Sequence, residues 1–108
     1  MCLNGAALRV RSLDSYLQRL IEHVLKLQYW TEEKERCQKG WIRAIVNFRT
    51  RIKRILKKNP SLKNYLVEEY SDIFQDAVTV VSCDFDVPEG SFIQLQQIMS
   101  EDYSGKPD

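Results

Sequence analysis

The stretch RTRIKRILKKNPSLKNYLVEEYSD, Arg49 to Asp72, contains the break that sets the order of the helices. Proline disfavours helical geometry at the residue before it, so a helix is expected to end near Lys58. Asn59 is a good N-cap and Pro60 suits the first helical position, so a further helix is expected to begin at once. The stretch therefore predicts a tight corner between two antiparallel, neighbouring helices.

The charge changes sign at this corner. Residues 1–60 hold 14 Lys and Arg against 5 Asp and Glu, a balance of +9. Residues 61–108 hold 2 Lys and Arg against 10 Asp and Glu, a balance of −8. Since the net charge is only +1, this asymmetry is the most informative bulk property of the chain.

Three interpretations of the asymmetry stay open. The first is a solvated charged face on each amphipathic helix. The second is electrostatic pairing across the corner, in which Arg51 is expected to meet Glu68 or Glu69, and Arg43 to meet Asp76. The third is a surface that contacts phosphates of nucleic acid. The basic residues of that surface are Arg43, Arg49, Lys53, Arg54 and Lys57.

Apolar residues recur at intervals of three and four, the spacing of amphipathic helices. The pattern predicts long helices over 12–29, 31–58 and 60–82, the last including the β-branched stretch 77–81. A loop is expected over 83–90, followed by a short C-terminal helix over 91–99 with Phe92, Leu95 and Ile98 or Met99 facing inward. Ser12 is expected to be the N-cap of the first. The predicted fold is all-α, a small antiparallel bundle of three long helices plus a short C-terminal helix, with the second helix as its central member. It forms one domain, 1–108, with frayed ends at 1–11 and 100–108.

Composition excludes several classes of protein. No apolar run approaches the length of a membrane-spanning helix, so no membrane association is expected. Three widely spaced cysteines without a CxxC motif argue against disulfides and thiolate metal sites, and they suit a reducing cytoplasm. With a single histidine, no metal is expected. The sequence lacks a GxSxG motif and a phosphate-binding loop, so neither an enzyme nor a cofactor is expected.

Two places are candidates for function. Gln28, Tyr29 and Trp30, at the end of the first helix, are interpreted as a packing corner, with a possible interaction patch as the alternative. His23, with Glu22 beside it, is the residue around which an unrecognised enzyme would be built. The function predicted first is a non-catalytic helical module that binds a protein partner or itself, and the alternative is an accessory protein that binds nucleic acid.

One group of motifs identifies a resemblance. The segments KLQYWTEEKERCQKGWIRAIVNFRTRI (26–52), PSLKNYL (60–66) and LQQIMSEDY (95–103) closely resemble the domain of unknown function 29 family. The resemblance covers about residues 14–103. Its matching positions are His23, Leu25, Lys26, Gln28, Tyr29, Trp41, Ile45, Arg49, Ile52, Pro60, Ser61, Leu62, Tyr65, Leu66, Tyr70 and Ala77.

The resemblance implies a small bacterial protein with an all-helical fold. The family has no assigned activity or cofactor, so no catalytic residue is transferred to this chain. Its members usually carry a further segment before the part that matches 12–29, so this chain resembles an N-terminally shortened member. A bundle without that segment would expose apolar surface, which favours dimerisation.

Overall fold

The computed structural model describes residues 4–100, and the side chains among them from Arg11 onward apart from those of Thr31 and Lys34. Within this range the chain forms three long helices and one short helix, without strands. The helices are α1 (Asn4–Tyr29), α2 (Thr31–Lys58), α3 (Leu62–Val81) and α4 (Leu95–Ile98). The all-α fold is therefore confirmed. Residues 1–3 and 101–108, which belong to the predicted frayed ends, lie outside the described residues.

The helix boundaries differ from the predictions in three places. Because α1 begins at Asn4, Ser12 lies inside the helix and is not its N-cap. The Ala- and Leu-rich residues before Ser12 favour helix, and one serine in a helix interior costs only a few tenths of a kcal/mol. At the other end of the chain, α4 is shorter than predicted: residues 91–94 are not helical, and Gln94 is extended. The third difference lies at the corner between α2 and α3.

This corner contains one additional turn. The backbone N–H of Asn59 donates to the carbonyl of Ile55 at 2.9 Å, and its side-chain amide donates to the same carbonyl at 3.2 Å. Asn59 is thus the C-cap of α2, whereas the N-cap position of α3 falls at Ser61. The N–H of Leu62 donates to the Asn59 carbonyl at 2.9 Å and closes the turn. The third helix therefore begins two residues later than the Asn59-Pro60 pattern predicted.

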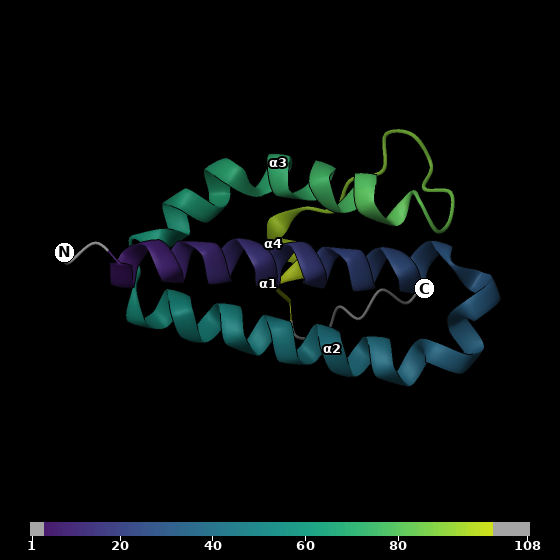
Figure 1. The fold of residues 1–108 in the computed structure, drawn as a ribbon, viewed down its shortest axis with the longest axis horizontal. Coiled ribbons are helices and arrows are strands. Elements are labelled where there is room, and N and C mark those ends of the chain that lie inside the picture. Colours follow the sequence, from purple (N-terminus) through teal and green to yellow (C-terminus); the bar gives the residue numbers. More distant parts are fainter. Residues whose placement is uncertain (1–3, 101–108) are drawn as a thin grey trace.

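The central helix is α1, and the prediction that α2 is central is wrong (Figure 1). In the figure α1 lies between α2 and α3, and it packs against both, whereas α2 and α3 hardly touch. The physical reason is the width of its apolar face, which covers about 160° of the helix at 100° per residue and can contact two neighbours. Its fully buried residues are Leu13, Leu17, Leu20, Ile21, Val24, Leu25 and Leu27.

The predicted ion pairs between α2 and α3 are therefore also wrong. Since α1 lies between the two helices, Arg43 on α2 and Asp76 on α3 do not meet, and both are exposed. Arg51 instead lies over the ring of Tyr16 on α1, with its guanidinium carbon 5.8 Å from the ring centroid. The opposite charges of α2 and α3 thus lie on two separate surfaces and do not form ion pairs between these helices.

The C-terminal segment fills the space between α2 and α3 on the far side of α1 (Figure 1). Ile93 and Ile98 are buried in the core. From α3, the hydroxyl of Tyr70 donates to the carbonyl of Ile93. From α2, Nε of Arg49 donates to the carbonyl of Ile98 at 3.2 Å. Two helices that hardly touch are thereby connected through one short segment.

Phe92 in this segment does not point inward as predicted. Its side chain is 51 % exposed, although its ring lies 5.0 Å from the Phe74 ring and 5.7 Å from the Tyr70 ring. It covers the outer side of these two aromatic residues of α3. The segment is therefore attached to α3 by ring contacts as well as by the hydrogen bond to Ile93.

A further polar contact connects α1 with α3. The hydroxyl of Tyr65 on α3 lies 2.8 and 3.0 Å from the two carboxylate oxygens of Asp14 on α1 and donates to this carboxylate. Burial, followed by the hydrogen bond and the charge of Asp14, raises the pKa of Tyr65 to about 12. The folded protein thus favours the protonated phenol.

Stability is expected to fall as the pH rises from about 10 to about 12. In this range the unfolded chain, whose tyrosines have ordinary pKa values near 10, releases the Tyr65 proton before the folded protein does. Tyr65→Phe is expected to remove this pH dependence and to lower the free energy of unfolding at neutral pH by about 1 kcal/mol. Thermal unfolding against pH and an absorbance titration of the tyrosines measure both effects. Tyr16→Phe is the control, and an unchanged pH profile in Tyr65→Phe would contradict the assignment.

Candidate functional site

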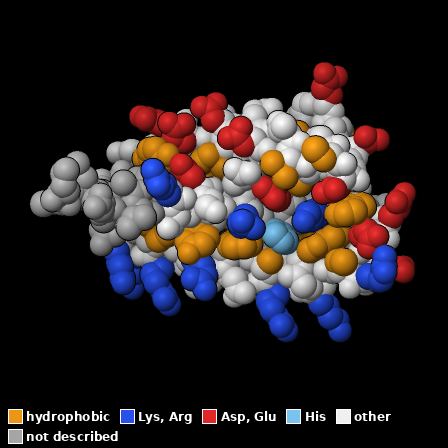
Figure 2. Space-filling view, viewed as in Figure 1, with side chains coloured by type: hydrophobic (Ala, Val, Ile, Leu, Met, Phe, Trp, Pro, Cys, Tyr) orange, Lys and Arg blue, Asp and Glu red, His pale blue; other side chains and the backbone are white. Residues whose placement is uncertain are grey.

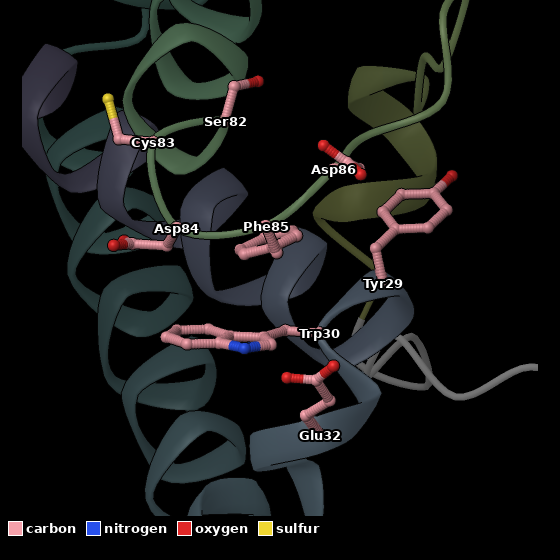
Figure 3. A pocket seen from close by; sticks show the side chains of 8 residues that line it. All are labelled: Tyr29, Trp30, Glu32, Ser82, Cys83, Asp84, Phe85 and Asp86. Atoms are coloured by element: carbon pink, nitrogen blue, oxygen red, sulfur yellow. The ribbon is translucent and has the colours of Figure 1, made fainter.

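A hollow of about 460 Å³ lies where the α1–α2 corner faces the loop after α3 (Figure 3). Tyr29, Trp30 and Glu32 line it from the corner. Residues 82–86, with the sequence Ser-Cys-Asp-Phe-Asp, line it from the loop. The hollow therefore combines two parts of the chain that are separated by some fifty positions in the sequence.

The wall of the hollow is an aromatic stack. The ring of Trp30 lies 5.9 Å from the ring of Trp41 on one side and 5.3 Å from that of Phe85 on the other, with interplanar angles of 22° and 21°. Trp30 occupies the N-cap position of α2, directly after α1 ends. Stacked rings of this kind stabilise each other beyond the area they bury, so the stack fixes the position of the loop against the corner.

The rim of the hollow is acidic. Glu32, Asp84 and Asp86 are exposed, and none of the described residues that line the hollow is Lys or Arg. In Figure 3 the carboxylates of Asp84 and Glu32 lie on opposite sides of the Trp30 ring plane. Carboxylates beside apolar rings attract a cation that carries an apolar stem, as Lys and Arg do.

The predicted interaction patch is partly brought together at this hollow. Tyr29 and Trp30 line it, but Gln28 does not and is half-buried beside it. The Tyr29 hydroxyl donates to Oγ of Ser91 at 3.3 Å, and Ser91 in turn donates to the Pro88 carbonyl at 2.6 Å. Tyr29 therefore also connects the end of α1 to the loop. Its role combines packing with lining of the hollow.

Asp84, Phe85 and Asp86 were not predicted as site residues. The sequence identifies 83–90 as a loop, and the alternation of acids with an aromatic residue was the available signal. Where that loop lies depends on the packing of α3 against α1, which no local pattern encodes.

One residue of the predicted phosphate-contacting face is buried in the structure. Arg49 is only 4 % exposed and donates to the Ile98 carbonyl, so it does not belong to the surface. Arg43, Arg54 and Lys57 are exposed on α2, and Lys53 is half-buried. Figure 2 shows Lys and Arg side chains along the edge formed by α2, and Asp and Glu side chains along the edge formed by α3.

His23 is engaged in packing within the bundle. Its Nδ1 donates to the carbonyl of Arg19 at 2.7 Å, and its ring lies 5.7 Å from that of Phe48. Burial lowers the pKa of His23 below its ordinary value, which favours the neutral imidazole. The neighbouring Glu22 accepts a hydrogen bond from the Gln18 amide at 3.0 Å. These contacts support a structural role for the residue.

Residues 4–100 contain neither grouped metal ligands nor a helix suited to crossing a membrane. No three His, Cys, Asp or Glu side chains of this range are grouped as metal ligands. None of the helices in the same range combines the length and the apolar character that crossing a membrane requires.

Comparisons with curated proteins and with solved structures found no match to the chain. The sequence profile of the family described as "Domain of unknown function DUF29" matches residues 7–104, from α1 through α4 and beyond. This confirms the resemblance carried by the QYW, PSLKNYL and LQQIMSEDY segments. The chain therefore belongs to the DUF29 family.

Proposed function

We propose that this chain is a non-catalytic protein-interaction module that acts in the cytoplasm and binds a basic segment of a partner protein in the hollow at the α1–α2 corner. The observation that carries the proposal is the acidic rim around an aromatic wall. Glu32, Asp84 and Asp86 supply negative charge, while Trp30 and Phe85 supply apolar surface. A lysine or arginine side chain complements both properties, because it carries an apolar stem and a charged end.

The geometry of the hollow favours a peptide over a compact small molecule. The hollow is partly open to solvent, and its three acidic residues are exposed. Pockets for small molecules are mostly apolar and enclose most of their ligand. An extended basic segment would instead cross the rim and place one side chain against the aromatic wall.

The test is a titration with a short lysine- and arginine-rich peptide, followed by tryptophan fluorescence and by amide chemical shifts. We expect shifts at Trp30 and in the loop 82–86, with no response to a glutamate-rich peptide of the same length. The double variant Asp84→Lys, Asp86→Lys is expected to bind about tenfold more weakly, since two exposed attractions become repulsions. A matched control, Glu35→Lys with Glu89→Lys, makes the same change of charge at two exposed acids that do not line the hollow.

Two outcomes would contradict the proposal. The first is equal weakening in the hollow variant and the control, which would show only a response to net charge. The second is the absence of chemical-shift changes around the hollow at saturating peptide. Circular dichroism of each variant ensures that a loss of binding does not reflect a loss of fold.

A second candidate function is binding of nucleic acid. The observation that favours it is the gathering of exposed Arg43, Arg54 and Lys57 along one side of α2. Phosphate contacts of this type release counterions, so retention on heparin or DNA would fall steeply with salt. Arg43→Glu with Arg54→Glu should abolish that retention, whereas the variant in the acidic hollow should keep it.

A further inference from the structure

The two charged helix faces that the sequence predicted to pair within the chain are both left exposed. The basic α2 face consists of Arg43, Val46, Thr50, Arg54 and Lys57. The acidic α3 face consists of Glu68, Glu69, Asp72, Asp76 and Val80, of which Glu69 is half-buried and the others are exposed. Because α1 lies between the helices, neither face can reach the other in the same molecule (Figure 1).

Each face is a continuous strip on its helix. At 100° per residue, the basic α2 face covers about 80° of arc and the acidic α3 face about 120°. At 1.5 Å per residue, Arg43 to Lys57 extends about 21 Å and Glu68 to Val80 about 18 Å. The two strips are therefore similar in length, and each is straight enough to lie along the other.

Each strip also contains an apolar residue that the fold leaves uncovered. Val46 is 50 % exposed among the basic residues, and Val80 is 47 % exposed beside the acids. A half-exposed valine is ordinary by itself. Val46 lies near the start of its strip and Val80 at the end of its own, so the two valines can meet when the strips lie antiparallel, and the charged residues form the rest of the contact.

We propose that the basic α2 face of one copy binds the acidic α3 face of a second copy of this chain. The occupant is a second copy because each molecule carries both complementary strips and has a net charge of only +1, so that pairing leaves no large excess of one sign. Contact between two α2 faces or two α3 faces would place like charges together and is disfavoured. This surface is separate from the hollow at the α1–α2 corner, so the proposal does not depend on the function proposed above.

Charge exchange tests the proposal. The basic-reversed variant carries Arg43→Glu, Arg54→Glu and Lys57→Glu, and the acidic-reversed variant carries Glu68→Lys, Asp72→Lys and Asp76→Lys. Each variant alone has two strips of the same sign and is expected to associate at least about tenfold more weakly than the wild type. An equimolar mixture presents opposite strips again and is expected to restore association. Analytical ultracentrifugation at low and high salt measures the masses.

The controls separate surface pairing from other effects. Lys58→Glu with Lys63→Glu changes charge at the α2–α3 corner outside both strips and should leave association unchanged. The hollow variant Asp84→Lys, Asp86→Lys should also leave it unchanged, which distinguishes this proposal from the binding of a basic segment. Circular dichroism confirms that each variant is folded.

Three results would overturn the proposal. One is a wild-type protein that is monomeric at low salt and high concentration. Another is association that neither salt nor either charge reversal affects. The third is a mixture of the two reversed variants that stays monomeric. If the wild type also binds DNA through the basic α2 face, that result assigns this face to nucleic acid and not to a second copy.

Discussion

Replacing Phe74 with alanine is expected to lower the free energy of unfolding by about 3–5 kcal/mol. Phe74 on α3 is fully buried, and its ring contacts those of Tyr70 and Phe92. Removing it leaves a cavity between α3 and the C-terminal segment, because the surrounding rings can relax only partly. Urea denaturation followed by circular dichroism measures the loss.

Two further variants make the Phe74 experiment decisive. Val67→Ala on the same helix, where the side chain is 57 % exposed, is expected to change stability by about 0.5 kcal/mol or less. Phe74→Leu retains most of the volume and is expected to cost about 1–1.5 kcal/mol, so it remains measurable if the alanine variant does not fold. A loss of less than about 1 kcal/mol in folded Phe74→Ala would contradict the burial of this side chain.

Arg49→Met is expected to lower the free energy of unfolding by about 2–3 kcal/mol. Methionine retains much of the buried stem, but the Ile98 carbonyl loses its charged donor inside the protein. Hydrogen bonds to charged groups contribute about 1.5–3 kcal/mol, and an unsatisfied buried carbonyl adds a penalty. The effect should appear in urea denaturation and as faster amide exchange in the C-terminal segment.

The comparison for Arg49 is Arg54→Met, five residues further along α2. Arg54 is exposed, so its replacement is expected to change stability by about 0.5 kcal/mol or less. Equal effects of the two substitutions would mean that Arg49 acts as a surface charge. In that case the phosphate-contacting face predicted from the sequence would regain its fifth member.

Helical periodicity predicted the elements well, because each long helix must bury an apolar face against the others. The bounds of α2 agree with the prediction, and the β-branched residues at the end of α3 are helical as expected. The order of packing was not predictable from chain order. The breadth of the apolar face on α1, to which Leu25 contributes, lets this helix contact both neighbours.

Arg49 shows how a charged residue misleads a sequence-based interpretation. On a helical wheel it lies only about 20° from Leu56, at the border of the apolar face of α2. Because Arg49 is charged, it was predicted to lie on the surface. The Ile98 carbonyl at the end of a short helix has no partner within that helix and needs a donor, so Arg49 lies in the core instead. That requirement becomes visible only when α4 is placed against α2.

The sequence allowed only one wall of the candidate hollow to be predicted. Tyr29 and Trp30 stand at a helix boundary that the sequence marks, so a corner rich in aromatic residues was expected there. Phe85 and its two acidic neighbours depend on the path of a loop after α3. Loops take their position from the elements they connect, and the placement of α3 beside α1 was the part of the fold that the sequence did not reveal.

The position of the C-terminal segment between α2 and α3 determines when the bundle can be completed during synthesis on the ribosome. Synthesis proceeds from the N-terminus, so the three long helices emerge before Ile93 and Ile98 do. Until then, Arg49 and Tyr70 lack the two carbonyls to which they donate in the folded protein. The nascent chain thus completes its bundle only after Ile98 has been synthesised.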